Sequence, residues 1–360
     1  MIGRLRGLFG KSGPEPRADA PAPQAPAETP RAPAPVPEDP AETERRLTAS
    51  VGEAERKGGD GVALGDALTF LGNFLVHYDR SSEAEGPLRR VLAIEEAAAP
   101  ARPGRLVMAL ANLASTCRYL GKRAEAEALY RRADELSKGS AEVADGLAVT
   151  VAENLMAMCS EDQRYADCEP LCLRSIALRE RIHGPTDEAL VVPLNNLATL
   201  YRQQRRHGEA EAALRRLIAL LERLRGPDHP DIAHDLHFLV DSCFMQDKVA
   251  EAEQLCRRAL SIYEKTVPLD LAGGAATLAN LAHILNRQGR VDEAEESYKQ
   301  ALLTVEVGGD AARSMTQHVL NGYAAFLRER GREAEAQTLA ERAAQFSAAS
   351  AQAAGQTAGV

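Results

Sequence analysis

The sequence repeats with a fixed period of 42 residues, and this register constrains the fold more than any other feature. Seven acidic residues follow one another at equal steps of 42, without insertion or deletion: Glu83, Glu125, Asp167, Glu209, Glu251, Glu293 and Glu335. The residue after each of them is small: it is Ala in six repeats and Cys168 in the remaining one. A period of this length indicates tandem structural units that must stack on their neighbours to bury an apolar face.

Each unit has the pattern of two amphipathic helices. Upstream of the acidic column, large apolar residues recur three and four positions apart, as in Leu194, Leu197 and Tyr201, which places them on one helical face. The acidic column opens the second helix, where negative charge complements the helix dipole. Ala, Glu, Arg and Leu dominate, and all four are strong helix formers. We therefore predict an all-α fold, a right-handed α-solenoid of about seven tandem helix-turn-helix repeats.

The breaks between the paired helices are marked by residues typical of turns: Asp79, Gly121, Asp247, Gly289 and Gly331. Outside the repeats, composition sets the predicted boundaries. Residues 1–12 form a short basic amphipathic segment, and residues 13–41 a disordered Pro/Ala-rich linker with ten prolines between Pro14 and Pro40. The solenoid is predicted over residues 42–345, with a capping helix at 42–57 and repeats from about residue 62, and a small, polar disordered tail over 346–360.

The residue pattern of the repeat resembles that of a known protein family. The best-matching stretch is Leu194-Asn195-Asn196-Leu197-Ala198-Thr199-Leu200-Tyr201, followed by Glu209-Ala210-Glu211. This pattern resembles the tetratricopeptide repeat (TPR), and the 42-residue unit resembles the longer kinesin-light-chain type. The resemblance implies a non-catalytic scaffold or adaptor that binds a peptide or helical segment of a partner protein. No sustained heptads precede residue 60, so the resemblance gives no reason to infer motor binding.

Charge and cysteine usage exclude several other classes. A net charge of −9 argues against nucleic acid as the main partner. The six cysteines lack close pairing, which indicates a reducing compartment, and we expect a cytoplasmic protein. All six fall in columns that other repeats fill with core residues, so we predict buried thiols, with no metal site and no cofactor. The sequence offers no catalytic constellation, and an enzyme with a site built across repeats is the least favoured alternative.

The arginine pairs of the second helices recur with the repeat: Arg89-Arg90, Arg131-Arg132, Arg215-Arg216 and Arg257-Arg258. Their repetition predicts a solvated surface rather than a nucleic-acid patch.

One column is not explained by the core. Just before the second leucine of the first helices stand Asn112, Asn154, Asn196 and Asn280, although Asn is a poor helix former. The family resemblance implies that this register lines the concave groove and holds the backbone of a ligand. The alternative is that the amides bond to neighbouring helices and hold the stack together.

Other residues of the predicted groove complete the expected site. Phe238 interrupts the asparagine column, where it would split the groove or form an apolar pocket floor. Arg118, Arg202, Gln203 and Arg287 share the face and would suit an acidic or carboxylate-bearing peptide. Acidic side chains on the same face oppose this preference, so the ligand charge stays open.

The amino terminus supports a second hypothesis. Ile2, Leu5, Leu8 and Phe9 recur at helical spacing among basic residues. Such a segment would dock on a partner or on the inner face of a membrane, and would make the protein a membrane-associated assembly factor. The alternative is a disordered start.

Overall fold

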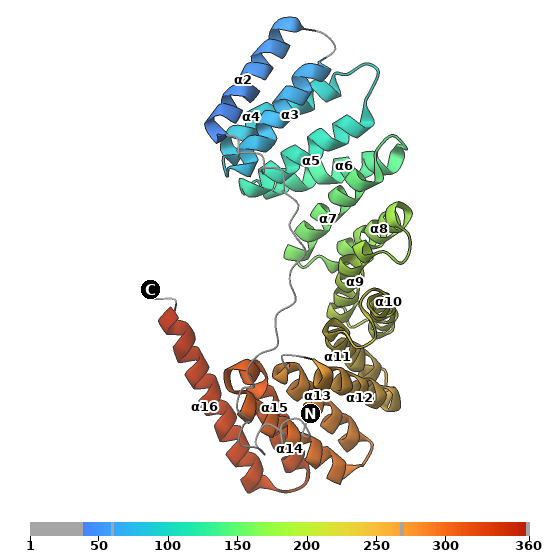
Figure 1. Ribbon diagram of the computed structural model, residues 1–360, viewed down its shortest axis with the longest axis vertical. Helices are drawn as coiled ribbons and strands as arrows, with labels where there is room; N and C mark the ends of the chain where they lie inside the picture. The colour runs from blue at the N-terminus through green and yellow to red at the C-terminus, as the bar shows by residue number, and fades with distance from the viewer. Residues whose placement is uncertain (1–38, 59–60, 267–269, 358–360) are drawn as a thin grey trace, which may run out of the picture. The chain divides into compact units, whose positions relative to one another are not determined.

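The computed structural model describes residues 39–58, 61–266 and 270–357, with side chains described as far as residue 347. Within this part of the chain every regular element is a helix, as predicted (Figure 1). The segment predicted over residues 1–12 lies outside the described residues, as does nearly all of the linker predicted over 13–41. None of the described helices is long and apolar enough to cross a membrane.

The described helices form two compact units, one ending at Pro185 and the other beginning at Thr186. We call them the amino-terminal and carboxy-terminal units. The amino-terminal unit consists of a single helix followed by three helix pairs: α2 (Pro40–Lys57), α3 (Val62–His77), α4 (Ser81–Glu96), α5 (Pro103–Tyr119), α6 (Arg123–Gly139), α7 (Asp145–Glu161) and α8 (Tyr165–His183).

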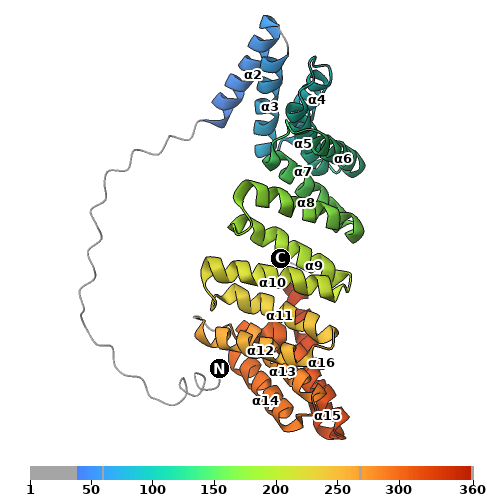
Figure 2. The same ribbon diagram turned by 90° about the vertical axis from the view of Figure 1, so that its right-hand side faces the viewer.

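The carboxy-terminal unit holds four helix pairs and two short 3-10 helices. Figure 2 labels the helices of these pairs as α9 to α16. The elements of this unit are η1 (Glu188–Leu190), α9 (Val191–Gln203), α10 (His207–Arg225), α11 (Pro230–Met245), α12 (Val249–Lys265), α13 (Leu271–Arg287), α14 (Val291–Gly308), η2 (Gly309–Ala312), α15 (Arg313–Glu329) and α16 (Glu333–Thr357). The two units together contain seven pairs, which agrees with the predicted repeats. The segment predicted as a tail continues α16 to Thr357, because its many alanines favour helix.

Each pair turns through one residue with a left-handed backbone, always at the same position of the repeat: Asp79, Gly121, Gln163, Arg205, Asp247, Gly289 and Gly331. The next residue then donates its N–H to a carbonyl five positions back, as Lys122 does to Cys117 at 2.8 Å. This bond closes the end of the first helix. Five of the seven turn residues carried a sequence signal, whereas Gln163 and Arg205 adopt the conformation without one.

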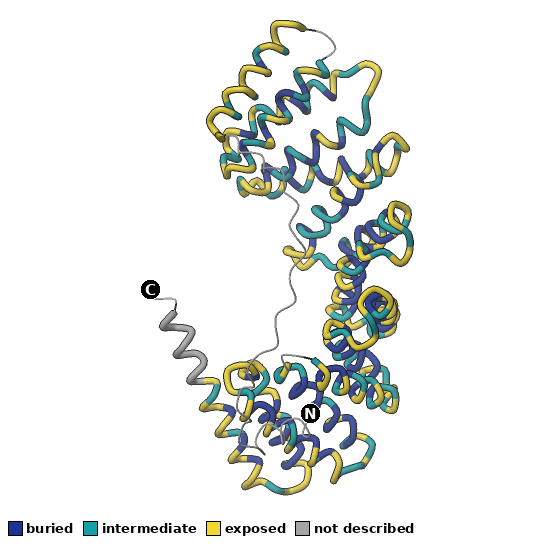
Figure 3. Tube along the Cα trace, viewed as in Figure 1, coloured by how far each residue is buried: buried dark blue, intermediate teal, exposed yellow. Residues whose placement is uncertain are grey.

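The core follows the predicted columns. The small column is buried in every repeat, from Ala84 to Ala336, and so are the leucines that face it, such as Leu110 and Leu236. Buried and exposed stretches alternate along the helices (Figure 3). All six cysteines are buried, as predicted, and none forms a disulfide. Small residues at this position let the second helix pack closely on the first.

A repeating ion pair, which we call the interlock, joins successive repeats within each unit. A glutamate on one second helix contacts the cation that precedes the next second helix, at 2.5–2.9 Å: Glu85 with Lys122, Glu127 with Arg164, Glu211 with Lys248, Glu253 with Arg290 and Glu295 with Arg332. These glutamates are only 11–22% exposed. The pairs are therefore shielded from solvent on the carboxylate side.

The arginine pairs are largely exposed, as predicted, and their side chains also take part in the ion pairs between repeats. Arg89 lies 2.8 Å from Glu85 on its own helix and 2.7 Å from Glu125 on the next repeat. Arg132 contacts Glu96 of the preceding repeat. These side chains are about half exposed, but their guanidinium groups bind neighbouring repeats.

Helix α2 extends the network to the first repeat. Its Glu44 contacts Arg80 at 2.6 Å, and its Glu55 contacts Arg90 at 2.5 Å. On its apolar side, Val51 is buried in a cluster with Leu68. Helix α2 thus packs on α3 and α4 as a repeat would, although the described residues contain no helix that pairs with it.

Candidate functional site

The predicted groove residues lie on the first helices of both units. In each unit separately, we call the surface that carries the asparagine column the asparagine face of that unit. In the amino-terminal unit it carries Asn112 on α5 and Asn154 on α7, and in the carboxy-terminal unit Asn196 on α9 and Asn280 on α13. Each of the four side chains is exposed or half-exposed.

The four asparagines differ in their hydrogen bonds. The side chains of Asn112, Asn154 and Asn196 make no hydrogen bond with any residue in the described part of the chain. Asn280 is different, because its Nδ2 lies 3.4 Å from Nδ1 of His237 on α11. A bond between neighbouring first helices is what the stacking alternative requires, and it occurs at Asn280.

The arginines of the predicted site already have ionic partners on neighbouring residues. Arg118 lies 3.6 Å from Glu161, and Arg287 lies 2.9 Å from Asp247. Arg202 lies 3.9 Å from Asp241. These contacts reduce the free positive charge on the face, so the arginines alone do not define an anion site. Gln203 is exposed at the end of α9.

Phe238 is not an open pocket floor. The guanidinium of Arg202 stacks on the Phe238 ring, with Cζ 3.8 Å from the ring centroid. The His234 ring lies nearly perpendicular to the Phe238 ring, with the two centroids 4.7 Å apart. Burial lowers the pKa of Arg202, opposed by the charge of Asp241. The ring therefore supports a cation–π stack between α9 and α11.

Sequence reasoning missed several apolar side chains on the same face. Met108, Tyr119, Val192 and Met245 are all exposed, Tyr119 to 71%. Each stands four residues before or seven residues after the asparagine register of its helix, a spacing that places it on the asparagine face. Together with Phe70, which occupies the register itself on α3 and is 64% exposed, they make this face partly apolar. Their fixed offsets from the asparagine column could have identified them from the sequence.

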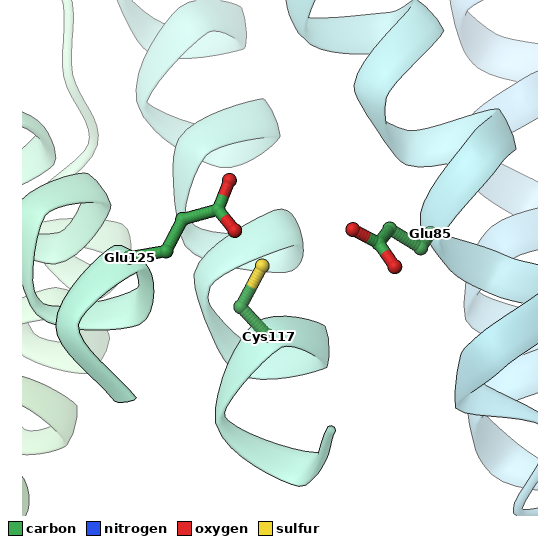
Figure 4. A group of neighbouring side chains, drawn as sticks. All are labelled: Glu85, Cys117 and Glu125. Carbon is green, nitrogen blue, oxygen red and sulfur yellow. The ribbon is translucent and has the colours of Figure 1, made fainter. Parts of the chain in front are cut away.

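Two further groups of potential ligand side chains lie between repeats, each with a cysteine on a first helix and glutamates on two successive second helices. Glu85, Cys117 and Glu125, shown in Figure 4, have ligand atoms within 4.8 Å of one another. Glu211, Cys243 and Glu251 repeat the arrangement. The interlock already places cations there. Lys122 lies 2.5 Å from Glu85, and Arg89 contacts both Glu85 and Glu125.

The thiol at the centre of this group is also unsuited to metal ligation. Burial, followed by the negative charge of Glu125, raises the pKa of Cys117, whereas a metal requires the thiolate. We assign both groups to the contacts between repeats.

Known proteins resemble the chain in its repeats. The family profile for the tetratricopeptide repeat matches residues 109–142, 147–223, 193–265 and 275–306. No protein of curated function matches the sequence.

Several solved structures are similar to the chain. One is BtubC (BKLC) from P. vanneervenii, with 19% identity over 75% of this chain and 92% of that one and a TM-score of 0.46. A putative kinesin light chain from Podosopora anserina shares 18% identity over 58% of this chain and 98% of its own, with a TM-score of 0.46. The apo form of RapI shares 13% identity over 85% of this chain and 80% of its own, with a TM-score of 0.49.

Proposed function

Because the chain belongs to the tetratricopeptide repeat family, whose members typically mediate contacts between proteins, we propose that it is a non-catalytic scaffold whose asparagine face binds a segment of a partner protein. Helical repeats suit this task, because stacked first helices present a long surface to an extended partner.

The proposal rests on three asparagine side chains that form no hydrogen bond with the described part of the chain. Asn112, Asn154 and Asn196 hold helix positions where Asn is unfavourable, yet their side chains bond to no described residue. An amide offers both a donor and an acceptor, so it can pair with the backbone of a bound segment whatever its sequence. A role in ligand binding accounts for their cost to the helix.

The apolar side chains beside these amides supply the remaining contact area. In the amino-terminal unit, Phe70, Met108 and Tyr119 surround the register of Asn112 on α3 and α5. Exposed aromatic and methionine side chains are typical of the centres of protein interfaces. The amides would fix the backbone of the partner segment, and the apolar groups would contact its side chains.

The test is affinity capture from the native lysate with the full chain. We expect the Asn112/Asn154/Asn196→Ala variant to lose partners that the wild type captures. The matched control is Gln254→Ala, which removes an exposed amide from α12, a second helix, and should leave the captured set unchanged. Circular dichroism must show that both variants remain folded. An identical set of captured proteins for the wild type and the triple variant would reject the asparagine face as the binding surface.

A further inference from the structure

Histidines gather on the asparagine face of the carboxy-terminal unit. Of the eight histidines in the chain, four lie on its first helices: His234 and His237 on α11, His283 on α13 and His318 on α15. His237 is half-buried and the other three are exposed. Histidine changes charge near neutral pH, so this face can change its charge where arginine or aspartate cannot.

His237 and Asn280 form a pair whose orientation depends on a proton. In the arrangement seen, Nδ2 of Asn280 faces Nδ1 of His237 at 3.4 Å, which fits a neutral ring that accepts from the amide. A protonated imidazole carries hydrogen on both nitrogens and cannot accept. Asn280 must then turn its amide so that Oδ1 accepts from His237 and its NH2 group points elsewhere. Protonation of His237 therefore decides which amide group Asn280 offers to a ligand.

Every element around His237 affects its protonation. Burial is the largest cause that lowers the pKa of His237. The positive charge of Arg202 on α9 and the neighbouring His234 and His318 lower it further, whereas Asp241 on its own helix raises it. Helix α13 contributes the neutral Asn280. The ring is therefore neutral at pH 7, and a bound carboxylate would favour its protonated form.

The permanent charges beside these histidines occur in pairs of opposite sign. Arg202 lies near Asp241, and Arg287 contacts Asp247. The exposed Arg328 on α15 is a further permanent cation of this face, and protons taken up by the histidines add to that surplus of positive charge. An acidic segment complements that surplus, whereas a neutral or basic one does not.

We propose that the asparagine face of α11, α13 and α15 binds acidic peptide segments more tightly below neutral pH, with His237 as the residue that orients Asn280. The inference rests on the proposed function and adds to it the class of ligand and its control by protons. Protons taken up on binding make the affinity rise as the pH falls.

The experiment measures fluorescence anisotropy of labelled peptides with the full-length protein. An alternating Gly-Glu peptide is compared with an alternating Gly-Gln peptide at about pH 7.5 and about pH 5.5, where Glu remains ionised. One proton taken up on binding changes affinity by up to tenfold per pH unit, so we expect the Gly-Glu peptide to bind roughly tenfold more tightly at the lower pH. The Gly-Gln peptide should show no such change.

Two variants test the roles of individual histidines. His237→Gln should reduce the pH response of the Gly-Glu peptide by roughly threefold or more, and so should His283→Gln, whose exposed position makes misfolding a poor explanation. The matched control is His207→Gln on α10, a second helix of the same unit, which should keep the full response.

Three results would overturn the inference. They are Gly-Glu binding of equal strength at both pH values, equal binding of the two peptides, or no binding of Gly-Glu at either pH. None of them bears on the capture of lysate partners through Asn112, Asn154 and Asn196, which tests the proposed function separately.

Discussion

The interlock between the first two repeats of the carboxy-terminal unit yields a quantitative prediction through Glu211. Its carboxylate accepts hydrogen bonds from Arg215 at 3.0 Å, Gln246 at 2.8 Å and Lys248 at 2.6 Å. The side chain is only 11% exposed. Glu211→Gln keeps the size of the side chain but removes the charge that these donors share.

The expected loss follows from the number and exposure of the contacts. A hydrogen bond to a charged group contributes about 1.5–3 kcal/mol when shielded, but Arg215 and Lys248 are each more than 40% exposed, so solvent screens part of this. We expect Glu211→Gln to lower the free energy of unfolding of the carboxy-terminal unit by about 1–2 kcal/mol.

The pH dependence of the effect has a definite sign. Burial alone would raise the pKa of Glu211, but the hydrogen bonds from Lys248, Arg215 and Gln246 outweigh it and hold the pKa below its usual value. The contribution of Glu211 is therefore complete above about pH 4.3, the ordinary value for Glu, and is lost as the pH falls through the lower folded value.

The assay is urea unfolding followed by circular dichroism, at neutral pH and in acid. The matched control is Glu209→Gln, which removes a more exposed carboxylate whose contact with Arg206 lies within one repeat. We expect the control to change stability by only a few tenths of a kcal/mol. Equal unfolding midpoints for the two variants at neutral pH would refute the reasoning, because the contact between repeats would then contribute nothing.

Three further predictions concern a turn residue, a buried carboxyl group and the cysteines. Gln163 has a left-handed backbone with φ of 57°, so Gln163→Gly should stabilise the chain by about 0.5–1 kcal/mol in urea unfolding, whereas Gly121→Ala at the equivalent turn should destabilise it. Burial, reinforced by the charge of Asp231, raises the pKa of Asp235 to about 6, so stability should fall as the pH rises from about 4 to 6, and Asp235→Asn should abolish this fall. A fall of equal size in that variant would show that Asp235 is not its source. The six buried thiols should react with a thiol reagent only after unfolding, and rapid labelling of the native chain would contradict their core positions.

Much of the fold could be predicted because seven copies of the same pattern identify helix and core positions that a single copy would leave uncertain. Columns such as Ala84 and Leu110 carry the same role in seven units, so the helix pairs and the core follow from the register alone. The turn at Arg205 could not be read from its residue type, since arginine has no preference for the left-handed conformation. Its position in the register was the only signal.

The interlock could have been found but was not. Glu85 and Lys122 are 37 residues apart, and only stacked repeats bring them together. A column of charged residues is normally exposed, so composition predicts a solvated surface where the structure has ion pairs between repeats. Similarly, the division after Pro185 has no counterpart in the unbroken 42-residue register.

The sequence predicts a candidate site on the first helices but does not determine the contacts that its side chains make. The register places Asn196 and Asn280 at equivalent positions, yet only Asn280 meets a histidine on the preceding repeat. Arg202 was predicted as a groove residue suited to an acidic peptide, and the structure stacks it on Phe238. Such contacts depend on side chains from adjacent helices, which the pattern of one repeat does not determine.

The central claim is that a partner segment lies against the asparagine face, and site-specific photo-crosslinking tests it most directly. A benzophenone amino acid is placed at the position of Asn196 on α9 or, as a control, at the position of Gln254 on α12, and the full chain is irradiated in native lysate. We predict that a partner crosslinks from the Asn196 position and not from the Gln254 position. A partner that crosslinks only from the Gln254 position would contradict the claim and would place the binding surface on the second helices.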